Sequence, residues 1–399
     1  MMSDGFNYGG EVAEIDSHFK VWPTDGNMTG AVDADLLPYR IGHIIAAHYS
    51  LSYTQAEFAV NEGHYPSLRD TPQYAEAWEM LCKELNSWVT GAGCDAAVLF
   101  VTNSASNFRL DIAFTEDYKG QRNPEKPPYF YELKEDLVTR LGAIVSDGEE
   151  ADDLMSIFVY DKAKELGVHP GTPEHREFCN TVVISTDKDS TITGGLHFDP
   201  VKMVKRFIDK FGTLEPKYKI KEVNDYATWP LFNGEPVDPA TCTVQGKLWY
   251  KGGVVCDQFG RGAKVGLPKT KRMLLGRKES ASIDDLKGSG LKFFYAQIIM
   301  GDSADNYNGI PGKGCTFAFN LLDGCKTEEE LYKAVLGAYK DHYGTGKHLA
   351  LNYRGTQQEL TAYQRMLEQG RLAWMQTYKG EIWRSTSTCP TGVDASWNA

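Results

Sequence analysis

Acidic side chains stand at the ends of predicted secondary-structure elements along this chain. Two apolar runs, residues 29–32 and 181–186, are typical of buried strands, and an aspartate directly follows each of them. Further acids open a predicted helix over 150–166 or follow one over 289–301. Because the carboxyl ends of parallel strands open onto one crevice, we expect these groups to converge there. The carboxylates concerned are Asp33, Glu150, Asp152, Asp153, Asp187, Asp189, Asp302 and Asp305.

Such a cluster would repel itself strongly unless cations neutralised it. Oxygen donors without His or Cys suit Mg²⁺ or Mn²⁺. The pattern therefore predicts two metal ions about 3.5–4 Å apart, which clamp the attacking and leaving oxygens of a phosphodiester. Each acid taken alone could instead cap a helix or complement its dipole. Four acidic groups, each at an element end, favour the metal interpretation.

Strand and helix patterns alternate over the first half of the chain, which predicts an α/β fold with a parallel sheet. Residues 50–72 are predicted as loop, and the chain becomes helical again from about residue 289. The expected strands are 29–32, 95–102, 144–145 and 181–186. The expected helices are 36–47, 73–90, 129–141, 150–166, 289–301, 316–323, 327–342 and 356–377.

Composition excludes several classes of protein. The longest uncharged apolar run, near Phe294–Met300, is far shorter than the ~20 residues that span a bilayer. The N-terminus has no basic-then-apolar signal pattern, and none of the eight cysteines forms a Cys-x-x-Cys pair. We therefore expect a cytoplasmic protein with reduced thiols, no membrane partner and no structural zinc.

A basic segment and a glycine-rich turn are candidates for holding phosphates. The segment over 116–124 offers Lys119 and Arg122 to a nucleic-acid backbone and Tyr118 to a base, and Arg109 precedes it. A solvated surface loop is the plainer alternative. The turn over 307–314 precedes a predicted helix and is interpreted as a helix–hairpin–helix that grips a duplex backbone. Its candidate contacts are Gly309, Gly312, Lys313 and Gly314.

Positive charge is concentrated in one part of an acidic chain. Residues 245–280 hold nine Lys or Arg against two acids, a net of +7, whereas the whole chain carries −12. Aromatic residues are interleaved with these cations, so an added grip on DNA is predicted, with Lys269, Lys271 and Arg272 as contacts. A solvated loop or a contact to another replication protein are the alternatives.

Taken together and in order, these motifs resemble the 5′-nuclease (flap endonuclease-like) family, and most of all the replication exonucleases of tailed bacteriophages. The resemblance covers about residues 29–200 and 289–325. It rests on Val-Asp33-Ala-Asp35, Tyr118-Lys-Gly-Gln-Arg122, Glu150-Ala-Asp-Asp153, Ser185-Thr-Asp-Lys-Asp189 and Gly301-Asp-Ser-Ala-Asp305. Lys126–Phe130, Glu368-Gln-Gly-Arg371 and Tyr378–Trp383 are also similar to that group.

The resemblance implies a PIN-like α/β core, a C-terminal helical (H3TH) region and Mg²⁺-dependent 5′→3′ exonuclease activity on duplex DNA, and on RNA primers paired to DNA, in phage replication. K⁺ is a further candidate at the helix–hairpin–helix. Lys119, Arg122 and Asp187 would be catalytic. By position, the first metal would be held by Asp33, Glu150, Asp152 and Asp153. The second would be held by Asp187, Asp189 and Asp305, with Asp302 nearby.

The chain departs from the family pattern in two ways. Asn103 stands where the family has an aspartate after the second strand, and whether Asp35 points so as to compensate is undecided. The 115 residues from Asp187 to Asp302 are long for the family, so the excess, about 205–290, is interpreted as an insertion. A structure-specific 5′-flap endonuclease is one alternative, because the sequence of the arch segment between Arg122 and Glu149 does not decide whether it threads a single strand. A non-catalytic protein that binds DNA junctions is another, motivated by Asn103. Replication partners in trans are expected because the chain has no polymerase region. The predicted divisions are a lead-in 1–29, a catalytic core 30–204 with arch segment 105–148, an insertion 205–288, a helical region 289–383 and a tail 384–399.

Overall fold

The computed structural model describes residues 21–103, 106–232, 234–242, 248–251, 254–257 and 270–383. Most of the predicted lead-in, the tail and Lys269 lie outside these residues. The chain divides into two compact units, one of residues 1–216 and 286–399 and one of residues 217–285. No described helix has the length and apolar character needed to cross a membrane.

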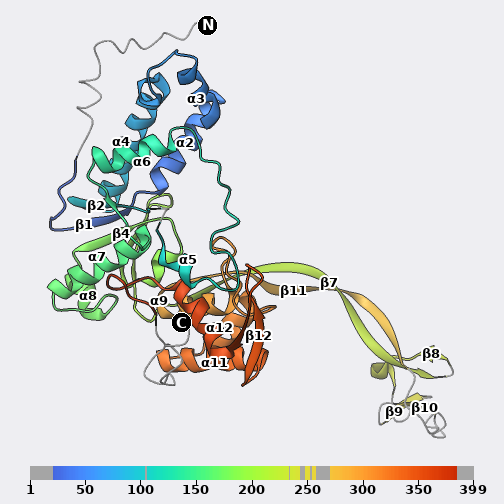
Figure 1. Ribbon diagram of the computed structural model, residues 1–399. Coiled ribbons are helices and arrows are strands. Elements are labelled where there is room, and N and C mark those ends of the chain that lie inside the picture. Colours follow the sequence, from blue (N-terminus) through green and yellow to red (C-terminus); the bar gives the residue numbers. More distant parts are fainter. Residues whose placement is uncertain are drawn as a thin grey trace. The chain divides into compact units, whose positions relative to one another are not determined.

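A six-stranded sheet with the order β3-β2-β1-β4-β5-β6 forms the centre of the first unit (Figure 1). Neighbouring strands are parallel except β6, which pairs antiparallel with β5. The four residues preceding Asp33 and all of β2 and β4 are buried, as expected for apolar strands covered on both faces. The strands are β1 (Thr29–Asp33), β2 (Ala96–Val101), β3 (Ile144–Val145), β4 (Thr181–Ile184), β5 (Gly195–Asp199) and β6 (Val204–Ile208). This confirms the predicted α/β fold with a parallel core.

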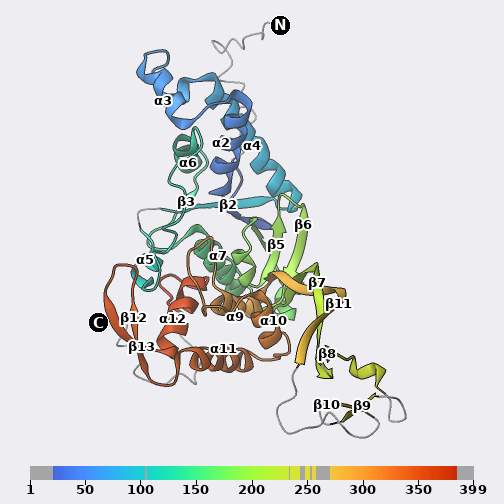
Figure 2. The same cartoon turned by 90° about the vertical axis from the view of Figure 1, so that its right-hand side faces the viewer.

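Helices cover both faces of this sheet (Figures 1 and 2). Val32 on β1 packs toward one core, which includes Ile41 of α2 and Trp78 of α4, and its neighbour Ala31 packs toward α7 through Val159. The alternation follows from the two-residue period of a strand. The helices are α2 (Leu36–Tyr49), α3 (Tyr53–Asn61), α4 (Pro72–Gly91), α5 (Phe108–Ile112), α6 (Phe130–Thr139), α7 (Ala151–Glu165) and α8 (Pro173–Phe178).

Helix α3 corrects the loop predicted over 50–72. Ser52 and Gln55 form a capping box, in which each side chain bonds the backbone N–H of the other residue. That Ser-x-x-Gln pattern is readable in the sequence and outweighs the scattered glycines around it. A short 3₁₀ turn, Leu68–Asp70, follows.

The C-terminal part of the first unit is a helical layer with its own core. Helix α9 is buried on all sides, so it lies at the centre of this core. The predicted helix over 356–377 begins too early, because residues 357–361 pair with 347–351 as a hairpin and Thr361 then caps the helix. The elements are α9 (Gly290–Met300), α10 (Cys315–Leu322), α11 (Glu328–Tyr343), β12 (Lys347–Leu351), β13 (Gln357–Thr361) and α12 (Ala362–Ala373).

The second unit contains most of two long paired strands, β7 (Leu214–Phe232) and β11 (Thr270–Gly288). Short strands β8 (Glu235–Pro236), β9 (Leu248–Lys251) and β10 (Val254–Asp257) complete it. Because β6 is part of the central sheet, the predicted insertion boundary at residue 205 lies too early.

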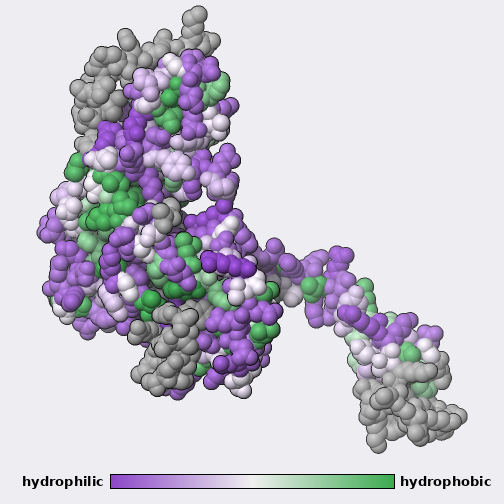
Figure 3. Space-filling model, in the orientation of Figure 1, coloured by the Kyte–Doolittle hydropathy of each residue, from purple (hydrophilic) through white to green (hydrophobic). Residues whose placement is uncertain are grey.

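The paired strands of the second unit expose both charged and apolar residues (Figure 3). Arg272 stacks on Tyr226, with its guanidinium carbon 3.8 Å from the ring centre. Lys278 pairs with Asp225 at 2.6 Å. Lys271 is exposed, and its contact with DNA stays a prediction.

Candidate nuclease site

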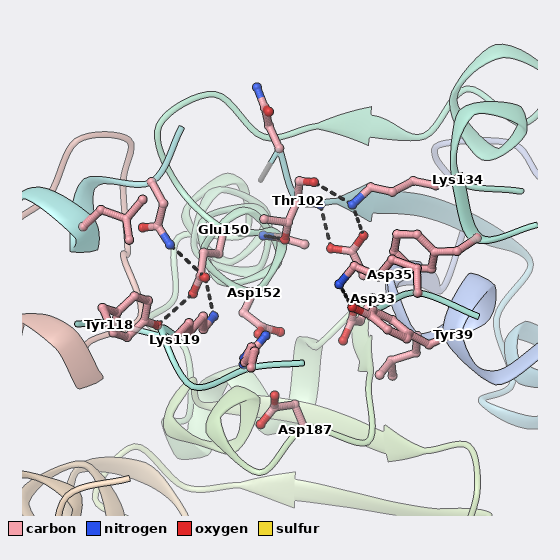
Figure 4. A pocket seen from close by; sticks show the side chains of 18 residues that line it. Asp33, Asp35, Tyr39, Thr102, Tyr118, Lys119, Lys134, Glu150, Asp152 and Asp187 are labelled. Carbon is pink, nitrogen blue, oxygen red and sulfur yellow. Dashed lines mark hydrogen bonds and ion pairs between the residues drawn. The ribbon is translucent and has the colours of Figure 1, made fainter. Parts of the chain in front are cut away.

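A pocket of about 360 Å³ lies at the carboxyl edge of the sheet (Figure 4). Asp33 ends β1, Asp187 follows β4, and Glu150 and Asp152 stand at the start of α7. The parallel strand order brings these ends together, as predicted. The acidic residues that line the pocket are Asp33, Asp35, Glu150, Asp152 and Asp187.

Three of these carboxylates have little positive charge to balance them. Burial, with Asp35 and Asp187 nearby, raises the pKa of Asp33 to about 8. Burial, with Asp33 and Asp187 nearby, raises the pKa of Asp152 well above its usual range. Desolvation and Asp305 also raise the pKa of Asp187. Each group thus makes ionisation of its neighbours harder.

Oxygen donors of this kind suit a hard divalent cation. Among the described residues, the buried Oδ1 of Asp152 accepts no hydrogen bond. Together with Asp33 and Asp187 it offers negative charge and unused lone pairs, which is the chemistry that Mg²⁺ takes. In the part of the chain that the structure describes, no group of three or more Asp, Glu, His or Cys side chains lies together closely enough to hold a metal ion.

Glu150 differs from these three because cations surround it. Its side chain accepts hydrogen bonds from Lys119 Nζ and from Asn107 Nδ2, the latter at 2.9 Å. Arg109 lies 3.4 Å away. Burial alone would raise the pKa of Glu150, but Arg109 and Lys119 hold it below its usual value.

A second acidic group adjoins Asp187. Burial and the charge of Asp187 raise the pKa of Asp189 to about 7. Asp302 is buried too, yet Lys188 at 2.6 Å holds its pKa below the usual value. Asp305 accepts hydrogen bonds from Arg122 at 2.7 Å and from the Tyr118 hydroxyl at 2.8 Å. Asp302 and Asp305 are therefore paired within the protein, whereas Asp187 and Asp189 stay close to each other.

Asp153 has a role different from the predicted one. It is fully buried and binds Arg109 through both carboxylate oxygens, at 2.6 and 2.9 Å. It also accepts the backbone N–H groups of Glu150 and Gln376, both at 3.0 Å. With its two oxygens occupied, Asp153 has none left for a metal, which contradicts the predicted ligand role.

Two predicted DNA contacts are buried as well. Arg109 is 1% exposed, and besides Asp153 it binds the carbonyls of Leu372 and Trp374 at 3.0 and 2.6 Å. Tyr118 is 3% exposed, and its hydroxyl links Asp305 to Glu150. Arg109 cannot reach a phosphate and Tyr118 cannot stack on a base, so both assignments are corrected to structural roles.

A cationic rim faces the acidic floor of the pocket. The rim comprises Lys119, Arg122, Lys126 and Lys134. Lys119 has a left-handed backbone, φ 57°, held by the bond of its N–H to the Asp305 carbonyl at 2.9 Å. This backbone, rare for a non-glycine residue, fixes the direction of the side chain. Lys119 and Arg122, both predicted as phosphate contacts, therefore lie beside the carboxylates.

Asp35 connects the end of β1 to the end of β2. Asp35 accepts the N–H of Thr102 at 2.7 Å and pairs with Lys134 at 2.6 Å. Asn103 lines the same pocket, and its backbone N–H binds Ser146 at 2.8 Å. Asp35 thus braces the two strand ends, and Asn103 occupies the place where the resemblance leads one to expect an aspartate.

The glycine-rich turn joins α9 to α10. Gly309 has φ 59°, and a Cβ there would lie 2.2 Å from the Ile299 carbonyl, so only glycine fits. Gly309 is buried and its N–H donates to Gln369 at 2.9 Å, so it does not face a ligand as predicted. Gly312 and Gly314 are exposed, and Lys313 lies over the ring of Phe317 at 4.4 Å.

Sequence reasoning assigned no role to the Glu-Gln-Gly-Arg stretch of α12. Glu368 is buried and accepts the N–H groups of Phe114 and Thr115 at 2.9 and 2.6 Å. Gln369 accepts the Gly309 amide. This helix therefore supports both the segment that leads to Lys119 and the glycine-rich turn. The only signal was that the stretch resembles the same family.

No protein-family model and no curated protein match this chain. Solved structures of the T5 D15 protein, co-crystallized with metal ions, match at 14% identity and a TM-score of 0.36, covering 80% of this chain and 91% of that one. The T5 5′-exonuclease with bound divalent zinc ions matches at 15% identity and a TM-score of 0.34, covering 80% and 92%.

Proposed function

We propose that this protein is a divalent-metal-dependent 5′→3′ exonuclease, which hydrolyses phosphodiester bonds from the 5′ ends of duplex DNA, and of RNA paired to DNA, in phage replication. One observation carries the nuclease assignment: three carboxylates without matching positive charge, Asp33, Asp152 and Asp187, lie opposite a cationic rim. Such a site attracts a metal ion to its floor and a phosphate to its rim. The 5′ polarity rests on the sequence resemblance.

The donor chemistry of this site suits divalent ions such as Mg²⁺ or Mn²⁺, and two of them are proposed here. Asp33, Asp152 and Glu150 would hold the first, and Asp187, Asp189 and Asp305 the second, with Asp302 paired to Lys188 behind them. Such ions, when bound, supply Lewis-acid activation of water and of the leaving oxygen. A protein nucleophile is not needed for this chemistry.

The chain's own groups position the phosphate. Lys119 binds Glu150 in the absence of substrate, and Arg122 binds Asp305. Both cations can exchange these carboxylates for phosphate oxygens, so they would orient the scissile group over the floor. The Tyr118 hydroxyl lies within hydrogen-bond distance of both Glu150, at 3.2 Å, and Asp305, at 2.8 Å, and can donate its one proton to either.

Contacts further along a duplex would come from two regions. Gly312, Lys313 and Gly314 are proposed to grip the backbone as a helix–hairpin–helix, with K⁺ as a candidate ion there. Lys271 and Arg272 of the second unit are proposed as an added grip, together with Lys269.

The first test is a time course with Mg²⁺ on a blunt duplex and a 5′-flap duplex, both 5′-labelled, with EDTA as the metal-free control. Short labelled products from the blunt duplex are expected. Asp187→Asn should abolish cleavage and retain binding, whereas Asp161→Asn, an exposed residue on α7, should cleave normally. Undiminished cleavage by Asp187→Asn would overturn the assignment.

A flap endonuclease is the second candidate, favoured by the segment between α5 and α6. This segment has no helix or strand, and it places Tyr118, Lys119, Arg122 and Lys126 along the pocket. A segment of this kind can guide a single strand past the carboxylates. Cleavage only at the flap junction would establish this activity. Tight binding without cleavage under any divalent ion would instead indicate an accessory protein whose chemistry was lost with Asn103.

A further inference from the structure

A second cavity, of about 640 Å³, adjoins the nuclease pocket along β5 and β6. Leu36 and Asp187 line both cavities, so the two meet at Asp187. Two side-chain hydrogen bonds hold the turn at this point: Ser190 Oγ donates to the Asp187 carbonyl at 2.8 Å and Thr191 Oγ1 donates to the Lys188 carbonyl at 2.6 Å. The function assigned to the first pocket does not use this space.

The walls of the second cavity are cationic. They carry Lys188, Lys202, Arg206 and Lys287, all exposed, against Asp187, Asp199 and Glu215. Arg206 is only loosely paired, 3.7 Å from Glu215. Among the described residues Lys287 forms no ion pair. Two cations are thus available to an anionic ligand.

Cations line both of the cavities that meet at Asp187. Asp187 lines both cavities, with Lys119, Arg122, Lys126 and Lys134 among the residues of the first and Lys188, Lys202, Arg206 and Lys287 among those of the second. A mononucleotide would need cations on one side only. A polynucleotide continues past the bond that is cut, so its phosphates need partners on both sides.

We propose that the second cavity binds the sugar-phosphate backbone of the cleaved strand on the far side of the scissile bond from Lys119 and Arg122. The inference rests on the proposed function and specifies its substrate as a strand held on both sides of Asp187. Arg206 and Lys287 are the principal phosphate contacts. A free 5′-mononucleotide, the product of exonuclease cleavage, carries the same phosphate chemistry, and the test separates the two.

The test measures binding of a 5′-labelled duplex by fluorescence anisotropy in EDTA over a series of salt concentrations. The variants are Lys287→Gln, which removes one exposed positive charge, and Arg206→Gln/Lys287→Gln, which removes two. The control is Lys164→Gln, an exposed lysine near the C-terminal end of α7. Each lost phosphate contact should lower the slope of log K against log salt by about 0.7–0.9, so the double variant should lose roughly 1.5. Its affinity should fall on the order of 10-fold.

Three outcomes would overturn the inference. The double variant could bind DNA with the same affinity and slope as the wild type. The control could lose as much as the double variant. Finally, the double variant could bind DNA like the wild type while deoxythymidine 5′-monophosphate inhibits its DNA cleavage in Mg²⁺ less strongly. That result would assign the cavity to the mononucleotide product. Failure of the proposed function is distinguishable, since it would show as absence of cleavage by the wild type in Mg²⁺, whereas this binding assay needs no cleavage.

Discussion

Asp152 and Asp153 are neighbours in the first turn of α7, yet the protein surrounds them differently. Asp153 is saturated by four hydrogen bonds, two of them from Arg109. Asp152 faces the pocket, and its Oδ1 has no hydrogen-bond partner among the described residues. Glu368 belongs with Asp153, since three donors from Phe114 and Thr115 satisfy it. A carboxylate saturated by the protein holds the fold together, and one left unsaturated is available to a ligand.

The largest effect expected from this contrast is on activity. Asp152→Asn should lower the nuclease rate by about 10³-fold or more, because a metal ligand supplies several kcal/mol of transition-state stabilisation. Its melting temperature should not fall, since the change removes repulsion with Asp33 and Asp187. Single-turnover cleavage and a thermal melt measure the two quantities. A variant that melts well below the wild type would show that Asp152 is structural after all.

Asp153→Ala should give the reverse profile. It leaves the buried guanidinium of Arg109 unpaired, so the free energy of unfolding should drop by about 3–5 kcal/mol. Urea unfolding measures this. The double variant Arg109→Met/Asp153→Leu removes both charges and should recover part of the loss. A loss below about 1 kcal/mol for Asp153→Ala would refute the proposed contrast between the neighbours.

Divalent ions should stabilise the folded protein through the unsaturated carboxylates such as Asp152, and not through saturated ones such as Asp153. At 100 times its Kd, Mg²⁺ should add about 2.7 kcal/mol to the stability of the wild type. Asp152→Asn should gain much less, while the exposed control Asp161→Asn should gain as much as the wild type. Thermal melts over a Mg²⁺ titration provide the measurement. Equal stabilisation of all three proteins would place the bound ion elsewhere.

The smallest effect is on the pH dependence of stability without metal. The pKa of Asp33 is raised to about 8 in the folded protein, so between about pH 4 and 8 the folded state binds protons that the unfolded state has released. Stability therefore falls as pH rises through this window, by up to about 1.4 kcal/mol per pH unit for each such proton. Asp33→Asn should show a shallower fall in urea unfolding between pH 5 and 8. An identical slope would indicate that Asp33 is ionised throughout.

The sheet and the positions of its strand-end acids could be predicted, because buried parallel strands are apolar runs with a definite end. Asp33 and Asp187 lie at the carboxyl edge for that reason. The difference between Asp152 and Asp153 could not be predicted. Consecutive helical residues point about 100° apart, and which one faces the pocket depends on how Met155 and Val159 seat α7 on the sheet.

Each of the other errors has an identifiable physical cause. The helix α3 was predicted as loop although its capping box is visible in the sequence. The strand β13 was predicted as helix because its stabilising partner, β12, pairs with it through tertiary contacts rather than through a periodic pattern. The buried position of Arg109 depends on carbonyls more than 260 residues away, and a local pattern cannot show such contacts.

Those distant carbonyls have a consequence for a chain that grows from its N-terminus. Arg109 and Asp153 leave the ribosome long before Leu372, Trp374 and Gln376 are synthesised. Until then the guanidinium lacks two acceptors and Asp153 lacks one donor, so the start of α7 is not locked in place. A nascent chain would therefore contain the carboxylates of the pocket before the start of α7 is fixed in its final position. Arg109 and Asp153 can complete these contacts only after residues 372–376 have been synthesised.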